Sequence, residues 1–170
     1  FEETEAIAPI DMLRRAKLDV KLVGVGTSTP TSSHGIRVTA DLTEAETKLD
    51  SSVQLIVLPG GMPGTLNLEK SPVVQSAIKY CVEKGIPVGA ICAAPSVLGR
   101  LGLLIGKRAT CFPGYESLLR GAEYTGEGVV TDGNVTTARG LGYALDLGLE
   151  LLALLTTKEN AAHVKSAIQY

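Results

Sequence analysis

Short apolar runs alternate along this chain with stretches whose apolar residues recur at helical spacing, and this alternation limits the fold more than any other feature. The runs at residues 20–25, 53–58 and 87–91 have the length of buried strands. Parallel strands need long crossover connections, which are usually helices packed on the faces of the sheet. The pattern therefore predicts an α/β fold with a mostly parallel sheet.

The same pattern assigns elements along the whole chain. Neither an internal repeat nor a low-complexity tract interrupts it, so we expect a single domain over residues 1–170. We expect strands at 20–25, 36–39, 53–58, 87–91 and 108–111, a hairpin at 128–139 turning at Asp132-Gly133, and helices at 4–16, 42–48, 72–84, 93–101, 143–155 and 160–168.

Composition excludes several classes of protein. Sixteen Lys and Arg against eighteen Asp and Glu give a net charge of −2 with no basic stripe, so no nucleic-acid partner is expected. No apolar run reaches the roughly 18–20 residues of a membrane span. Three cysteines are an odd number, which favours free thiols in a reducing compartment. With no secretory signal in the first residues, we expect a cytoplasmic protein without membrane contact.

One cysteine has a setting suited to chemistry. The segment Gly-Ala-Ile-Cys-Ala-Ala-Pro-Ser, residues 89–96, places Cys92 between a buried strand and a helix, as in a nucleophile elbow. A helix N-terminus favours the thiolate, so the sequence predicts an acidic, reactive Cys92. Cys81 lies within a helix and is interpreted as core, whereas Cys111, at a strand end, can be core or pocket wall.

Two further segments can approach Cys92. Leu-Pro-Gly-Gly, residues 58–61, ends a strand at the same edge of the sheet, and its amides could form an oxyanion hole with the Ala93 N–H, although a plain tight turn is the alternative. Glu2, Glu3 and Glu5 open the first helix, where carboxylates commonly complement the helix dipole and face water. Of the two histidines, His163 is expected on the surface, and His34 lies in a loop that could reach a pocket.

Five motifs occur in order along the chain: Glu-Glu-Thr-Glu-Ala at 2–6, Pro-Ile-Asp-Met-Leu-Arg-Arg-Ala at 9–16, Leu-Pro-Gly-Gly at 58–61, Ala-Ile-Cys-Ala-Ala-Pro at 90–95 and Ala-Arg-Gly at 138–140. Together they resemble the ThiJ/PfpI superfamily, in the branch of the parkinsonism-associated deglycase and bacterial YajL. The resemblance implies a strand before residue 1, a homodimer, and a site without cofactor or metal. It also implies that Cys92 is the nucleophile and Glu5 the acid that contacts it, with backbone N–H groups from Gly61 and Ala93 and with Gly60, His34, Cys111, Phe112 and Arg139 around the pocket.

Pattern and resemblance together predict a flavodoxin-like, three-layer α/β/α sandwich around a mostly parallel sheet. Two residues depart from the relatives. Phe112 precedes Pro113 where several relatives have histidine, so a Cys-His dyad at that position is excluded. His34 stands where the nearest relatives carry an arginine, which removes an anion-binding group from the pocket rim.

The resemblance implies a cysteine-dependent, cofactor-free enzyme of glyoxalase or deglycase type, with methylglyoxal, glyoxal or their adducts as substrates. The alternative is a redox-sensing stress protein or holdase whose Cys92 oxidises to sulfinate. A PfpI-type intracellular peptidase needs a histidine directly after the nucleophile, where this chain has Ala93. A glutamine amidotransferase would need a late His-x-Glu pair, which the sequence lacks.

Overall fold

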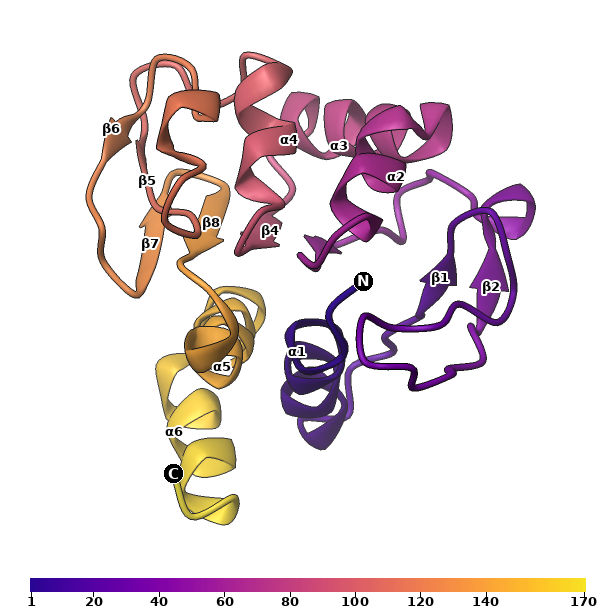
Figure 1. Ribbon diagram of the computed structural model, residues 1–170. Coiled ribbons are helices and arrows are strands. Elements are labelled where there is room, and N and C mark those ends of the chain that lie inside the picture. The colour runs from indigo at the N-terminus through magenta and orange to yellow at the C-terminus, as the bar shows by residue number, and fades with distance from the viewer.

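The computed structural model describes residues 1–170, and a four-stranded sheet lies at its centre (Figure 1). The spatial order is β3 (Ile56–Leu58), β4 (Val88–Ile91), β8 (Val135–Ala138) and β7 (Val129–Asp132). β3 pairs with β4 and β4 with β8 in parallel, whereas β7 and β8 form the predicted antiparallel hairpin. The mostly parallel sheet expected from the sequence is therefore confirmed.

Helices cover both faces of this sheet, which makes three layers (Figure 1). On one face lie α1 (Glu3–Arg15), α5 (Ala144–Leu155) and α6 (Lys158–Ala167), with α1 packed along α5. On the other lie α2 (Gly64–Lys70), α3 (Pro72–Glu83) and α4 (Pro95–Arg100). Each face encloses its own cluster of buried apolar residues. The predicted α/β/α sandwich is confirmed.

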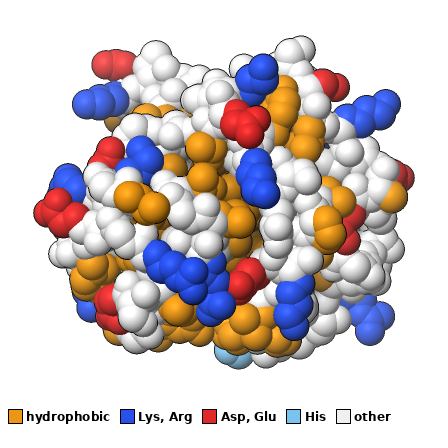
Figure 2. Space-filling view, turned by 90° about the horizontal axis from the view of Figure 1, so that it is seen from above, with side chains coloured by type: hydrophobic (Ala, Val, Ile, Leu, Met, Phe, Trp, Pro, Cys, Tyr) orange, Lys and Arg blue, Asp and Glu red, His pale blue; other side chains and the backbone are white.

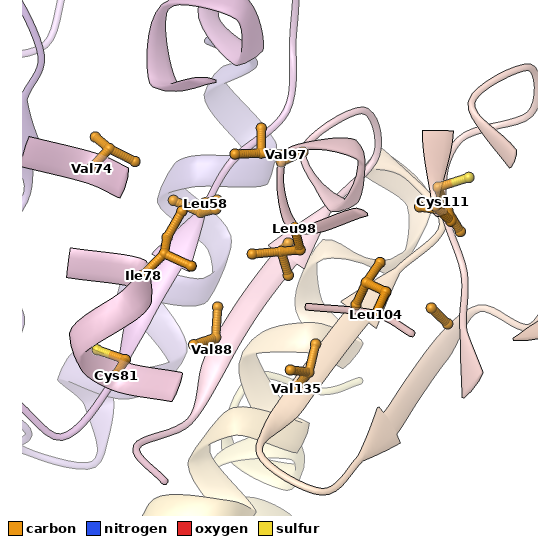
Figure 3. Packing of buried hydrophobic residues seen from close by; sticks show 14 residues of the cluster. Leu58, Val74, Ile78, Cys81, Val88, Val97, Leu98, Leu104, Cys111 and Val135 are labelled. Atoms are coloured by element: carbon orange, nitrogen blue, oxygen red, sulfur yellow. The ribbon is translucent and has the colours of Figure 1, made fainter. Parts of the chain in front are cut away.

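The core under α3 and α4 explains why these elements form where they do. Val74, Ile78 and Cys81 recur at helical spacing on α3 and point toward strand residues such as Leu58 and Val88 (Figure 3). Burying an apolar side chain of this size contributes about 1.5–3 kcal/mol, so the apolar period of α3 fixes its orientation. Cys81 is buried in this cluster, as predicted.

Helix starts are set by side chains that accept from free backbone N–H groups. The Ser71 hydroxyl accepts from the Val74 N–H at the start of α3, and Thr157 accepts from the Asn160 N–H at the start of α6. At α1 this cap is the Glu2 carboxylate, which accepts from the Glu5 N–H at 2.7 Å. The cap fixes the first turn of α1.

Several predicted elements are wrong or shorter than expected. The helix expected at 42–48 is a strand, β2 (Leu42–Thr43), followed by a single 3₁₀ turn (Glu44–Glu46), because the Glu46 carboxylate turns back to the Thr43 N–H and hydroxyl. The strand expected at 20–25 is only β1 (Val23–Gly24), paired in parallel with β2. Only one isolated bridge, Thr31 to Arg37, reaches the strand expected at 36–39.

Other short elements were not predicted. α2 begins with glycine and contains asparagine, both weak helix formers, so its sequence gives little helical signal. β6 (Glu123–Tyr124) has two exposed residues that carry no strand pattern, and it pairs in parallel with β5 (Arg108–Ala109), the shorter form of the strand predicted at 108–111. Two further 3₁₀ turns cover Glu116–Leu118 and Leu141–Tyr143.

The surface carries charges of both signs. On the side formed by the upper elements of Figure 1, Lys and Arg are interspersed with Asp, Glu and apolar side chains (Figure 2). No helix is both long and apolar enough to cross a membrane.

Candidate active site

Cys92 occupies the turn between β4 and α4 in a strained conformation. Its φ of 65° is rare for a residue with a side chain. Two neighbouring segments hold it there: the Cys92 N–H donates to the Ala138 carbonyl at 2.9 Å, and the Cys92 carbonyl accepts from the Phe112 N–H at 2.9 Å. Such strain, stored where a strand meets a helix, is a feature of functional sites and agrees with the predicted elbow.

Glu5 reaches Cys92 from the first turn of α1. It is 1% exposed, and its Oε2 accepts from the Gly60 N–H at 3.1 Å. Gly60 lies against both groups, since a Cβ added there would meet Glu5 Oε2 at 2.5 Å and the Cys92 Cβ at 2.7 Å. Only glycine fits between them. The Leu-Pro-Gly-Gly turn thus lets the carboxyl group approach the sulfur.

The pKa values of the thiol and of the carboxyl group are both raised, although the hydrogen bond with Cys92 by itself lowers the pKa of Glu5. Burial raises the pKa of Glu5, and the neighbouring charge of Glu2 adds to this. Burial, followed by the charge of Glu5 and its hydrogen bond to the thiol, raises the pKa of Cys92 to about 12. Two negative charges in this space are unfavourable, so the pair keeps one proton at neutral pH.

The expectation of a Cys92 acidified by a helix N-terminus is therefore wrong. α4 has only six residues and begins at Pro95, three positions beyond the sulfur-bearing residue, so its dipole is weak at Cys92. The backbone N–H groups of Ala93 and Gly61 are what lower the pKa of Cys92, and burial together with Glu5 outweighs them. A thiolate forms here when the shared proton lies on Glu5.

An open cavity of about 330 Å³ lies nearby; neither Cys92 nor Glu5 lines it, but two of its lining residues are hydrogen-bonded to the pair through their backbone. The Phe112 N–H is bonded to the Cys92 carbonyl, and the Leu141 N–H is among the donors that lower the pKa of Glu5. The cavity is lined by Phe112, Pro113, Arg139, Gly140, Leu141, Gly142 and Tyr143.

The structure brings most of the predicted site residues together. Gly60, Gly61 and Ala93 surround the Cys92–Glu5 pair, and Phe112 and Arg139 line the adjoining cavity. The remaining candidates lie elsewhere.

Cys111 is not a pocket wall. It is fully buried in the apolar cluster on the α3 and α4 side of the sheet, where burial raises its pKa to about 11 (Figure 3). Its side chain and that of Phe112 point to different surroundings, because alternate residues of an extended segment face opposite ways.

His34 pairs with Glu3 on the surface. Its Nδ1 lies 3.0 Å from Glu3 Oε1, its side chain is mostly exposed, and it does not line the cavity. The side-chain ligand atoms of Glu2, Glu3 and His34 lie within 4.8 Å of one another, close enough to coordinate one metal ion. The helix cap and the His34–Glu3 contact already engage them. His163 is exposed on α6, as predicted.

Sequence reasoning missed three contributors to the site. Glu2 is buried rather than facing water, and its charge helps to keep the proton on Glu5. Leu141 and Tyr143 line the cavity from the turn after β8. Leu141 and Tyr143 could have been predicted from their position directly after the Ala-Arg-Gly motif, because ligands bind at the carboxyl ends of the strands in such a sheet.

A polar pair displayed at the carboxyl edge of a parallel sheet, with cysteine on a strained strand-to-helix turn, defines the class of α/β domains that carry a nucleophile elbow.

Within that class, the chain belongs to the DJ-1/PfpI family, whose family model matches residues 1–154. It is 38% identical over 98% of its length to protein DJ-1 homolog B of Arabidopsis thaliana, but spans only 38% of that relative. It is 32% identical to the glutathione-independent glyoxalase DJR-1.2 of Caenorhabditis elegans, covering 93% of this chain and 84% of the relative. The crystal structure of Drosophila melanogaster DJ-1beta superposes with a TM-score of 0.90 at 30% identity, covering 99% of this chain and 91% of that one.

Proposed function

We propose that this protein is a cofactor-free enzyme of glyoxalase or deglycase type that acts on methylglyoxal, glyoxal and their adducts through Cys92. The observation that carries the proposal is the contact between the Cys92 thiol and the buried Glu5 carboxyl group. A group that both holds and returns a proton beside a sulfur nucleophile is what an internal proton transfer requires.

The reaction begins when the Cys92 thiolate, with the shared proton on Glu5, adds to the aldehyde carbon of methylglyoxal. A sulfur–carbon bond forms, and the aldehyde oxygen takes the proton from Glu5. The Gly61 and Ala93 N–H groups, which already favour negative charge at this position, stabilise the oxyanion that develops.

Glu5, now ionised, then takes the hydrogen of the former aldehyde carbon as a proton and returns it to the neighbouring carbon. The hydroxyl proton of the first carbon passes to the ketone oxygen, so the first carbon is oxidised to a thioester, the second is reduced to an alcohol, and no external oxidant is needed. Water releases lactate and restores the thiol. Because Phe112 cannot transfer protons, this shuttle depends on Glu5.

The similarity to a Caenorhabditis elegans relative named as a glutathione-independent glyoxalase supports this substrate class. Three free cysteines support action in a reducing compartment, and we place it in the cytoplasm. An exposed apolar side of α1 supports a homodimer.

The decisive test is lactate formation from methylglyoxal by the wild type and by Cys92→Ser. We expect turnover in the wild type and none in the variant above the uncatalysed rate. Cys81→Ser is the matched control, because Cys81 is a free cysteine in the core far from the elbow in sequence. Absence of lactate from the wild type would contradict the proposal.

The second candidate is a redox sensor, favoured by the same N–H groups and a protonated Glu5, which would also stabilise the oxygens of a Cys92 sulfinate. Such a protein would form sulfinate under mild peroxide without producing lactate. Intact-mass analysis of peroxide-treated protein, run beside the lactate assay, separates the two functions.

A further inference from the structure

The cavity beside Cys92 is larger than a methyl group requires. Its volume is about 330 Å³. For comparison, an apolar cavity of about 150 Å³ holds a benzene molecule in another protein. That cavity is enclosed, whereas the one near Cys92 is open to solvent, so it admits a substituent of the size of an aromatic ring and its walls contact one side of the ring.

The walls of the cavity present aromatic and aliphatic side chains to this space. Phe112 and Leu141 are each 48% exposed and Tyr143 is 38% exposed, so their apolar surface is available for contact. Phe112 is held in place because its N–H donates to the Cys92 carbonyl, and Gly140 lies against its ring, where an added Cβ would be 3.3 Å from Phe112 Cδ2.

Arg139, the one cationic residue that lines the cavity, can also interact with an aromatic ring. Arg139 forms no ion pair within 4.0 Å, although its charge influences Glu116. An unpaired guanidinium can stack on the face of an aromatic ring, a contact worth about 0.5–1 kcal/mol at exposed sites. An aliphatic chain gains nothing comparable.

We propose that this cavity binds the substituent on the ketone carbon of the substrate, that the preferred substrates are α-oxoaldehydes with an aromatic substituent, and that Phe112 determines this specificity. The inference deepens the proposed function and rests on it for the reaction. In this arrangement the aldehyde carbon lies at Cys92 while the ring lies against Phe112 and Leu141. The product would be an aromatic α-hydroxy acid.

The first test compares kcat/KM for phenylglyoxal and methylglyoxal. We expect the wild type to favour phenylglyoxal by about tenfold or more, the range in which apolar pockets discriminate. We expect Phe112→Ala to lower this ratio about tenfold. Because Phe112 is exposed, its replacement should leave the fold intact. Ile105→Ala, an exposed apolar residue outside the cavity, keeps the ratio of the wild type. Equal use of both substrates by the wild type, or an unchanged ratio in Phe112→Ala, would overturn the inference.

The second test does not depend on turnover. Alkylation of Cys92 by 2-bromoacetophenone is compared with alkylation by bromoacetone, each rate divided by that of free cysteine with the same reagent. We expect the phenyl reagent to be favoured about tenfold in the wild type and the preference to disappear in Phe112→Ala. In the first test, intact-mass spectra identify arginine adducts formed by the two α-oxoaldehydes.

Together the tests separate the two proposals. A phenyl preference in alkylation with no turnover of either aldehyde leaves the cavity assignment standing and contradicts the proposed reaction. Turnover of both aldehydes with no phenyl preference in either test contradicts the cavity assignment alone.

Discussion

Cys92 and Glu5 can share one proton, because burial raises the pKa of both groups and the charge of Glu5 raises that of Cys92 further. That proton can lie on sulfur or on carboxylate, and the two forms have the same net charge. Their ratio is therefore independent of pH. The Gly61 and Ala93 N–H groups favour the form with thiolate and protonated Glu5. Reactivity at this cysteine comes from the position of a proton and not from a low thiol pKa.

This sharing predicts an unusual pH profile for alkylation of Cys92 by iodoacetamide. An ordinary thiol with a pKa of about 8.5 gains about tenfold in rate per pH unit below that value. For Cys92 we expect a rate that rises through the raised pKa of Glu5, stays flat while the pair holds one proton, and rises again toward the thiol pKa of about 12. Mass spectrometry of briefly labelled protein measures it.

Two comparisons sharpen this prediction. Cys81, fully buried with a raised pKa, should label far more slowly than Cys92 throughout. In Glu5→Gln the negative charge that raises the thiol pKa is gone, so the plateau should give way to an ordinary titration at lower pH than in the wild type. A tenfold rise per pH unit across the neutral range in the wild type, as in an ordinary thiol, would rule out a shared proton.

Glu5→Gln should also separate substrate capture from turnover. Glutamine keeps the shape of the side chain and its contact with Gly60 but has no acid proton to transfer. We expect the fold to persist and lactate formation to fall by about 10²- to 10⁴-fold, the usual loss for a positioned acid-base, while addition of Cys92 to the aldehyde weakens much less. Steady-state lactate assays and rapid mixing measure the two steps. If Glu5→Gln produced lactate at the wild-type rate, another group would have to be the proton shuttle.

At the scale of elements, the site depends on how closely α1 packs against α5. Gly148 of α5 makes this possible, since a Cβ there would meet the Pro9 Cα and the Met12 Cγ, each at 2.9 Å. Pro9 lies one turn beyond Glu5 on α1. A larger residue at Gly148 would therefore displace the helix that carries the acid.

We expect Gly148→Val to lower both stability and turnover. Overpacking of this kind typically costs about 1–3 kcal/mol, and each kcal/mol lowers the Tm of a domain of this size by about 2–4 °C. Leu154→Val is the matched control on α5, because Leu154 is exposed and the same residue type is introduced without a clash. Thermal unfolding and the lactate assay report the two effects. A Gly148→Val protein as stable and active as Leu154→Val would show that the close approach is not needed.

The sequence predicts the long helices and strands and the buried catalytic residues better than it predicts the short elements and the residues that line the cavity. α3 was predictable because its apolar period matches the face that it buries, and β4 because its continuous apolar run fits a strand buried on both faces. β6 and the 3₁₀ turn after β2 are held by a few local hydrogen bonds that leave no period in the sequence. Cys92 and Gly60 carried local turn signals, whereas Leu141 and Tyr143 join the site only through the return of the chain after β8. The raised pKa of Cys92 required knowing that Glu5 is buried against it.

At the scale of the whole molecule, α1 has two apolar sides and this chain covers only one. Met12 and Leu13 are buried toward α5, whereas Ile7 is 41% exposed. Ile7 and Ile10 border a groove of about 240 Å³ shared with Leu22 of the segment before β1. An exposed apolar helix face beside a groove is a surface suited to contact with a second copy.

We therefore expect a homodimer that uses this side of α1. Light scattering on the purified protein at micromolar concentration should give a particle of twice 17.8 kDa. Ile7→Glu places a charge on the apolar side and should shift the protein toward monomer, because an unpaired charge buried in an interface costs several kcal/mol. Ile105→Glu introduces the same charge at a more exposed residue, 70% against 41%, and should remain dimeric. A wild-type particle of 17.8 kDa would contradict the dimer, and a dimer that survives Ile7→Glu would move the interface to another face of the molecule.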